Sequence, residues 1–105
     1  MQIISKLSDM IEEELNDAEK YIKCALTYKD EDPSLANTFY KLSTEEMGHV
    51  DSLHTQVTAK IAEYRKEHGD PPERMQGIYD YMHKKQVERA NSIKASQNVF
   101  KTESK

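Results

Sequence analysis

The stretch "STEEMGHVDSLH", residues 43–54, decides the fold, because it puts Glu46 and His49 on a line of apolar residues in the middle of a long helical pattern. Steps of four and three along that line keep one face of a helix turned inward. Its members are Leu35, Phe39, Leu42, Glu46, His49, Leu53 and Val57. A buried carboxylate is costly unless it is paired or bound to a metal. We therefore expect Glu46 and His49 to meet a partner or a ligand in the core.

The size and composition of the chain predict one small helical domain. It has 105 residues and a mass of 12.2 kDa, near the lower end of the range in which one hydrophobic core suffices, so we expect a single domain over residues 1–105. Hydrophobic residues make up 36%, charged residues 32%, and the mean hydropathy is -0.90, which is typical of helices with one narrow apolar stripe each. Such stripes also pair between chains, so a homo-oligomer is expected.

Charge and cysteine content exclude several classes of partner. The formal net charge is -4, and acidic and basic residues are interspersed along the chain, so no basic patch predicts binding to nucleic acid or to a membrane surface. The single cysteine, Cys24, excludes an intrachain disulfide and a cysteine-based zinc finger. No apolar run approaches the roughly 20 residues of a membrane span, and the start of the chain lacks a signal-peptide pattern. We expect a cytoplasmic protein.

Glycine and proline mark two breaks in the helical pattern, "KDEDP" at residues 29–33 and "HGDPP" at residues 68–72. Asp32 can cap the start of a second helix, which ends at Gly69, and Asp70 can cap a third. No strand pattern is present, so the predicted fold class is all-α. The predicted helices span about residues 3–28, 33–67 and 71–99, followed by a polar tail at 100–105.

The first helix carries a carboxylate on its own apolar line. The members of this line are Leu7, Ile11, Glu14, Ala18, Tyr21, Ala25 and Tyr28, with Leu15 and Ile22 widening it. If the connecting turn is centred near Glu31, Glu14 lies 17 residues before it, and Glu46 and His49 lie 15 and 18 residues after it. With a rise of about 1.5 Å per residue, antiparallel packing puts all three within about one turn of the same level. We expect them to meet.

These three residue types suit a metal ion. One Glu from a helix and Glu-x-x-His from the facing helix form half of the ligand set of a carboxylate-bridged dinuclear iron site. The i, i+3 spacing places Glu46 and His49 on one helix face. Carboxylates with one imidazole suit iron or manganese, and zinc is the usual competitor. The complete ligand set needs this unit twice.

The third helix does not offer the missing half. Residues 91–94, Asn-Ser-Ile-Lys, would come level with the cluster, and none of them is a good iron ligand. Asp80 and His83 have the i, i+3 spacing but no facing carboxylate. Asp51 and His54 point off the main face of the second helix, so we expect them to be solvated. The pattern therefore favours two copies of the first two helices, related by a twofold axis.

The residues over about 10–55 resemble the ferritin-like superfamily, which includes the rubrerythrins. The resemblance lies in Glu14, in Tyr21 seven positions later, and in Glu-Met-Gly-His at residues 46–49 after a short turn. In that superfamily these positions hold two metal-binding carboxylates, a nearby tyrosine and a metal-binding histidine.

A closer similarity is to the encapsulated ferritin-like proteins, whose short chains supply half a bundle and build the iron site between two protomers. This resemblance implies a ferritin-like antiparallel helical hairpin plus a third helix, completed to a four-helix metal-binding bundle by dimerisation. The end of the chain, "NVFKTESK", does not resemble the apolar docking peptide of that family. A protein shell is therefore not predicted as a partner.

The function implied by the resemblance is that of a di-iron protein with two ions per dimer. It would oxidise Fe(II) to Fe(III) with dioxygen or peroxide, as a ferroxidase-type oxidoreductase in iron storage or detoxification. The implied catalytic residues are Glu14, Glu46, His49 and Tyr21. Of these, Glu46 would bridge the ions, with Glu14 and His49 as terminal metal ligands.

Two alternatives remain open on sequence alone. One is a metal-free structural or adapter bundle, in which buried polar residues fix how the helices pair. The other is a zinc or manganese binder without turnover.

Overall fold

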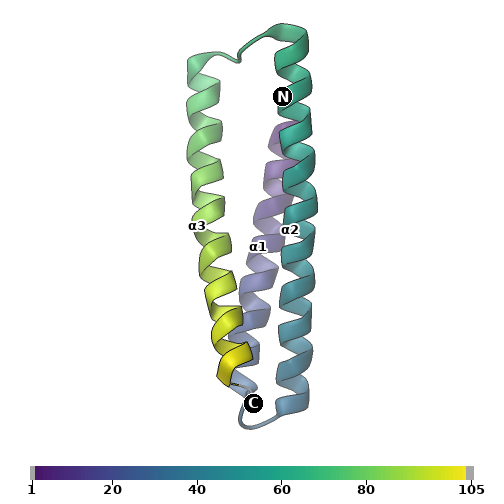
Figure 1. Ribbon diagram of the computed structural model, residues 1–105, viewed down its shortest axis with the longest axis vertical. Coiled ribbons are helices and arrows are strands. Elements are labelled where there is room, and N and C mark those ends of the chain that lie inside the picture. The colour runs from purple at the N-terminus through teal and green to yellow at the C-terminus, as the bar shows by residue number, and fades with distance from the viewer. Residues whose placement is uncertain (1, 104–105) are drawn as a thin grey trace.

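The computed structural model describes residues 2–103 and contains three α-helices and no strand within them (Figure 1). The helices are α1 (Gln2–Tyr28), α2 (Pro33–His68) and α3 (Glu73–Glu103). The predicted all-α class is confirmed. The molecule measures 55 × 18 × 17 Å, so its length is that of its longest helix. No helix in the described range is long and apolar enough to cross a membrane.

The ends of α2 follow from local chemistry. The Asp32 side chain accepts a hydrogen bond from the Leu35 N–H at 3.2 Å, and Pro33 occupies the first helical position, as predicted. At the other end Gly69 has φ of 76°, and its N–H donates to the Arg65 carbonyl at 2.9 Å. That positive φ favours glycine, because a side chain there would be strained.

The third helix differs from the prediction at both ends. It begins at Glu73, after the two prolines, and its first hydrogen bond runs from the Gln76 N–H to the Pro72 carbonyl at 3.0 Å. It continues through Glu103, so the predicted polar tail is wrong over residues 100–103; residues 104–105 lie outside the described range. The physical reason is Phe100, which is only 3% exposed and anchors this last turn in the core.

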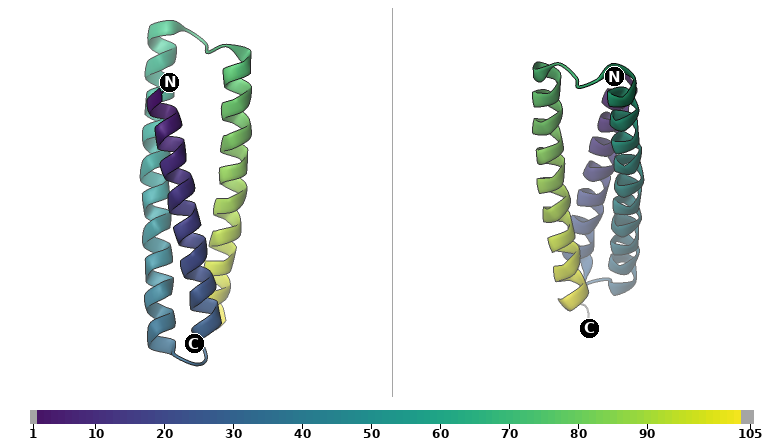
Figure 2. Two further views of the ribbon diagram at one scale, coloured as in Figure 1. Left: turned by 180° about the vertical axis from the view of Figure 1, so that it is seen from behind. Right: turned by 45° about the horizontal axis from the view of Figure 1, so that its top comes forward.

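The helices α1 and α2 form a closely packed antiparallel hairpin, and α3 packs mainly against α1 (Figure 2). The ribbon of α3 is farther from that of α2 near the start of α3 than near its end, where the three helices converge (Figure 1). Side chains bridge the wider part, since Arg65 donates to Gln76 at 2.9 Å. At that end the rings of Tyr40 and Phe100 stack with centroids 4.9 Å apart. Lys29 and Glu103 form an ion pair beside them.

The core is a line of small and branched side chains where the three helices meet. It includes Ala18, Ala25, Ala36 and Ser43, each 0% exposed, and these small residues let α1 and α2 approach closely. The buried residues are Ile4, Ser8, Ile11, Leu15, Ala18, Ile22 and Ala25 of α1, Ala36, Ser43, Met47, Val50 and Val57 of α2, and Gln86, Ile93, Gln97 and Phe100 of α3.

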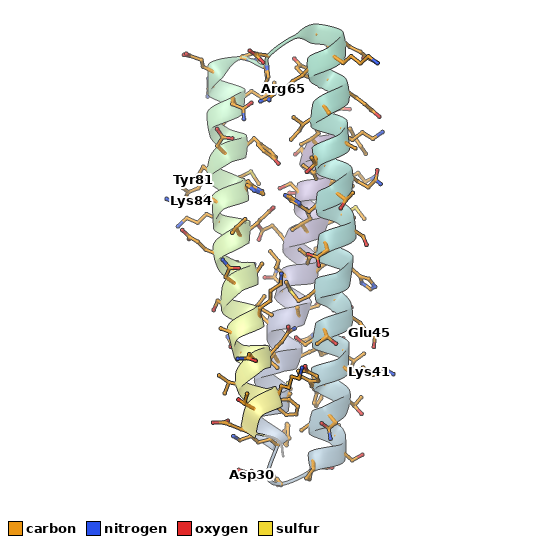
Figure 3. The ribbon with its side chains drawn as sticks, viewed as in Figure 1. Asp30, Lys41, Glu45, Arg65, Tyr81 and Lys84 are labelled. Atoms are coloured by element: carbon orange, nitrogen blue, oxygen red, sulfur yellow. The ribbon has the colours of Figure 1, made fainter. Side chains whose placement is uncertain are left out.

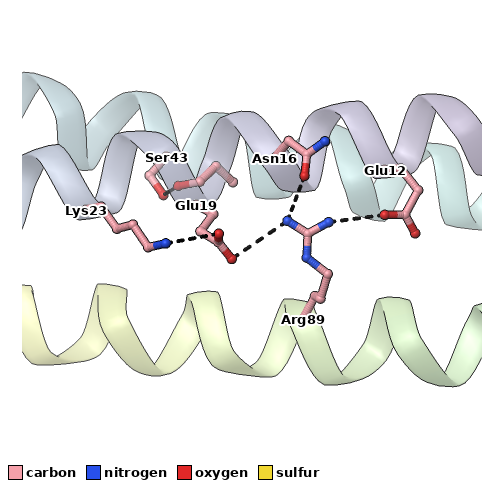
Figure 4. A network of polar contacts seen from close by, with 7 residues as sticks. Glu12, Asn16, Glu19, Lys23, Ser43 and Arg89 are labelled. Atoms are coloured by element: carbon pink, nitrogen blue, oxygen red, sulfur yellow. Dashed lines mark hydrogen bonds and ion pairs between the residues drawn. The ribbon is translucent and has the colours of Figure 1, made fainter.

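Polar contacts fasten α3 to one side of the hairpin (Figure 4). Arg89 donates to Glu12 Oε2 at 3.1 Å and to Asn16 Oδ1 at 2.9 Å, and it lies 3.7 Å from Glu19 Oε2. Deeper in the bundle, Gln86 Nε2 donates to Ser8 Oγ at 3.0 Å. The side of α1 that carries Glu12, Asn16 and Glu19 therefore faces α3.

A second apolar line runs along the hairpin on the side away from α3, and we call it the outer stripe. Its members are Leu7, Met10, Glu14, Tyr21 and Tyr28 of α1, and Leu35, Phe39, Leu42, Glu46, His49 and Leu53 of α2. None of them is fully buried, and Met10 is 40%, Leu35 39% and Tyr28 37% exposed.

The prediction that these lines face the core is confirmed for six members, which are buried: Ile11, Leu15, Ala18, Ile22, Ala25 and Val57. Leu7, Phe39 and Leu53 are partly buried and pack against this core. For the remaining members the prediction is wrong in a single chain, because the outer stripe lies beside the core line. The steps of four and three describe either of two neighbouring lines on a helix, and α3 covers only one of them.

Candidate metal centre

The structure brings Glu14, Glu46 and His49 together, as their levels along the hairpin predict. Each offers one ligand atom, and these atoms all lie within 4.8 Å of one another. His49 Nδ1 lies 3.5 Å from Glu14 Oε2 and 3.6 Å from Glu46 Oε2. The imidazole thus sits beside both carboxylates.

A buried hydrogen bond sets the register that makes this meeting possible. The Ser43 hydroxyl donates to the Ala18 carbonyl at 2.7 Å, deep between α1 and α2. Glu46 lies one turn after Ser43, and Glu14 lies one turn before Ala18. Because the helices run in opposite directions, both steps lead the same way along the hairpin, and the two carboxylates arrive at one level.

The cluster is partly open to solvent in the single chain. The side chain of Glu46 is 19% exposed, that of Glu14 28%, and that of His49 60%. The prediction that Glu46 and His49 are buried is thus wrong for one chain, because they belong to the outer stripe and α3 packs on the other side of the hairpin. The three side chains remain accessible to an ion and to a second protein surface.

The donor set fits a hard or borderline divalent cation. Two carboxylates beside one imidazole provide negative charge and oxygen-rich coordination, the combination that suits iron and manganese. A ligand oxygen or nitrogen binds such an ion at about 2.0–2.2 Å. Two atoms bound to one ion therefore lie at most about 4.4 Å apart. The separations of 3.5 Å and 3.6 Å between His49 Nδ1 and the two carboxylate oxygens fall within that limit. Three residues are half of the set for a dinuclear site.

The third helix adds nothing to this cluster. Within residues 2–103, α3 contributes no His, Cys, Asp or Glu to it. Asn91 and Lys94, which were expected at the level of the cluster, line a different cavity together with Val50 and His54. One chain therefore does not complete the ligand set with α3.

Tyr21 lies on the outer stripe next to aromatic neighbours. Its ring is 6.3 Å from that of Phe39 at an interplanar angle of 24°, and Lys20 Nζ lies 5.7 Å from its centroid. No hydrogen bond joins its hydroxyl to Glu46 in the described part of the chain. The catalytic role of Tyr21 stays a prediction.

The sequence did not predict a contact between two histidines of different helices. His54 of α2 and His83 of α3 meet across the bundle, with His54 Nε2 3.3 Å from His83 Nδ1. Local spacing relates each histidine only to its own helix neighbours, Asp51 and Asp80. Whether His83 faces His54 depends on the rotation of α3 about its own axis, and the spacing within one helix does not determine that rotation.

Neither a protein-family model, nor a curated protein, nor a solved structure matches the chain. The resemblance to ferritin-like proteins therefore rests on the residues of the outer stripe and on their geometry.

Proposed function

We propose that the protein is a ferritin-like di-iron protein, in which two chains together bind two irons and oxidise Fe(II) to Fe(III). The observation that carries this proposal is the convergence of Glu14, Glu46 and His49 within 4.8 Å on an antiparallel hairpin. This is the half-site that carboxylate-bridged iron proteins use twice in a four-helix bundle.

The outer stripe supports a second hairpin as the missing half. It flanks the cluster with apolar side chains on both sides along the helix axis, such as Met10 and Leu35, which are 40% and 39% exposed. A twofold partner that covers this stripe would bury them and bring a second set of three ligand residues to the first. The result is a homodimer with two hairpins at its centre and one copy of α3 on each outer side.

In this dimer the ligand residues would supply negative charge to the iron ions and leave coordination positions on them open for the oxidant. Oxidation of two bound Fe(II) ions to Fe(III) would supply two electrons, which together with two protons reduce one hydrogen peroxide to two waters or one dioxygen to hydrogen peroxide. Glu46 is the most enclosed of the three ligand residues, which suits a bridging position. Glu14 and His49 then bind as terminal ligands from opposite helices. The carboxylate charge of Glu14 and Glu46 favours Fe(III) over Fe(II).

The test measures iron content, oxidation rate and solution mass together. Protein purified without metal is loaded anaerobically with Fe(II) and then exposed to air or peroxide. We expect about one iron per chain, found only in a dimer or larger assembly, and oxidation faster than in buffer. The variant Glu46→Gln should lose both iron binding and iron oxidation, because it removes the negative charge. It keeps the shape of the side chain, so the fold should not change.

Glu45 provides the matched control, since it neighbours Glu46 and points away from the bundle (Figure 3). Glu45→Gln should bind and oxidise iron as the wild type does. A monomer that holds two irons tightly would contradict the half-site. Equal oxidation rates with and without protein would mean that the protein binds iron but does not catalyse its oxidation. Preferential retention of zinc or manganese would point to a binder without turnover.

The dimer is tested separately through the outer stripe. Leu35→Lys and Met10→Lys place charge on partly exposed positions, so the single chain should still fold. We expect both variants to sediment as monomers and to lose iron. Val99→Lys is the control, because Val99 is 44% exposed and lies on α3. If both outer-stripe variants stay dimeric, the second hairpin packs elsewhere.

A further inference from the structure

A pair of histidines links α2 to α3, on a different face of α2 from Glu46 and His49. His54 Nε2 and His83 Nδ1 lie 3.3 Å apart, although the residues are 29 positions apart in the chain. Their rings are nearly parallel, with an interplanar angle of 21° and centroids 4.9 Å apart. Both side chains are half-buried. This contact lies between the two helices that otherwise pack least against each other.

The distance between the two nitrogens suits a metal ion as well as a proton. Two imidazole nitrogens that bind one tetrahedral zinc at about 2.0–2.1 Å lie about 3.3–3.4 Å apart. A single hydrogen bond uses the lone pair of one histidine, whereas an ion uses the lone pairs of both. The rings could therefore accept an ion with little change in their separation.

The surroundings supply a nearby carboxylate and space for water. Asp51 lies one turn before His54 on α2, and both line an open cavity of about 240 Å³ with His83. The Tyr79 ring stacks on the His83 ring at 5.8 Å and 10°, which restrains its orientation. Lys94 also lines the cavity and brings a positive charge that opposes a cation. The carboxylate of Asp51 offsets that charge.

We propose that His54 and His83 bind a divalent transition-metal ion that holds α3 against α2, with water from the open cavity filling its other coordination positions. Two imidazoles favour zinc, copper or nickel, whereas the carboxylate-rich cluster of Glu14 and Glu46 favours iron or manganese. The chain would thus carry two metal sites of different chemistry. This second site does not depend on the iron site, because His49 and His54 lie on different faces of α2.

The test uses zinc as the probe and removes the first cluster. Untagged Glu14→Gln/Glu46→Gln protein is titrated with Zn²⁺ by calorimetry and melted with and without the ion. We expect about one zinc per chain and a higher melting temperature with zinc. Loss of a residue that merely supports a ligand costs about 10–100-fold in affinity. Adding His54→Gln or His83→Gln, which removes a ligand itself, should therefore weaken binding by at least about tenfold.

The matched control is His68→Gln, since His68 is exposed at the end of α2 and far along the helix from His54. It should leave zinc affinity unchanged. No zinc binding by the Glu14→Gln/Glu46→Gln protein, or equal affinity in the His54 and His83 variants, would overturn the proposal. Because a histidine variant could lose zinc binding by misfolding, a second measurement uses protein that keeps all its histidines. In it, zinc should shift the ring NMR signals of His54 and His83 and leave those of His68 unchanged. The absence of such shifts would also overturn it.

Discussion

The Ser43 hydroxyl lies 2.9 Å from Gln97 Nε2, at a point where both side chains are buried between α2 and α3. Ser43 accepts this bond from Gln97 and donates its own proton to the Ala18 carbonyl at 2.7 Å. One hydroxyl therefore ties all three helices together. Three residues later, Glu46 points to the outer stripe. The hairpin thus uses one face to hold α3 and the neighbouring face to present its ligand residues.

Removing the Ser43 hydroxyl should destabilise the fold. In Ser43→Ala the amide of Gln97, which is 9% exposed, loses its acceptor. A buried donor left without a partner costs about 1–3 kcal/mol. Urea unfolding at fixed protein concentration measures the loss. The double variant Ser43→Ala/Gln97→Leu removes both partners and should recover part of the stability. A double variant that is less stable than Ser43→Ala would contradict this account.

Phe100 should contribute strongly to the stability of the fold, although it lies near the end of the chain. It is 3% exposed and stacks on Tyr40, so Phe100→Ala opens a cavity under the last turn of α3. Such truncations cost about 3–5 kcal/mol. The neighbouring exposed residue Val99 gives the control, since Val99→Ala should change stability little. Thermal melting of both variants checks the prediction.

The sequence predicts the start and end of α2 well, because Asp32, Pro33 and Gly69 act through local backbone chemistry. It also predicts that Glu14, Glu46 and His49 meet, because a short turn allows little shift of one helix along the other in an antiparallel hairpin.

The face of the hairpin that α3 covers was not predictable in the same way. Ser43 and Gln97 are polar, and nothing in their local pattern marks them as core, whereas the apolar Met10 lies on the outer stripe. The choice between two adjacent lines depends on the rotation of α3, and this in turn depends on distant contacts such as those of Arg89. Helical periodicity carries no information about such contacts.

Arg89 should hold α3 through geometry as well as charge. Its guanidinium reaches Glu12 and Asn16 together, which the single ammonium of Arg89→Lys cannot reproduce in the same fork (Figure 4). We expect Arg89→Ala to lower stability by about 1 kcal/mol, with Arg89→Lys between it and the wild type. The difference should shrink at high salt, where exposed charges are screened. Urea unfolding at two salt concentrations tests this; a loss that is independent of salt would point to packing alone.

The alkaline limit of stability should involve Tyr79. Burial, and then the negative charge of Asp80, raise the pKa of the Tyr79 phenol above its usual value of 10.0. The folded state therefore keeps this proton to higher pH than the unfolded state does. The resulting stability is fully present below about pH 10 and is lost as pH rises through the folded-state pKa.

Replacement of Tyr79 by phenylalanine removes this ionisation. Between pH 9 and the folded-state pKa, urea unfolding of Tyr79→Phe should show a shallower decline in stability than the wild type. Tyr81→Phe is the control, because Tyr81 lies on the same helix and is 63% exposed. Equal slopes for Tyr79→Phe and the wild type would contradict the prediction.

Replacing Glu46 by leucine separates a metal centre from a purely structural cluster. In the proposed dimer each chain brings Glu14 and Glu46 to one enclosed site, and His49, even when protonated, balances only one of the two charges. Without metal the carboxylates repel one another and lose solvent. Glu46→Leu should then stabilise the metal-free dimer by about 1–3 kcal/mol, as when other buried ionic groups are replaced by packed apolar ones, and it should abolish iron binding. Glu45→Leu, on the exposed side, should leave iron binding intact.

The measurement is thermal melting of metal-free protein at one fixed concentration, because the stability of a dimer depends on concentration. Solution mass and bound iron are recorded on the same samples. If the cluster instead serves to fix how the helices pair, Glu46→Leu should melt at a lower temperature and give mixed oligomers, and the wild type should melt identically with and without Fe(II). A metal centre predicts instead that Glu46→Leu raises the melting temperature of the metal-free protein and that Fe(II) raises the melting temperature of the wild type.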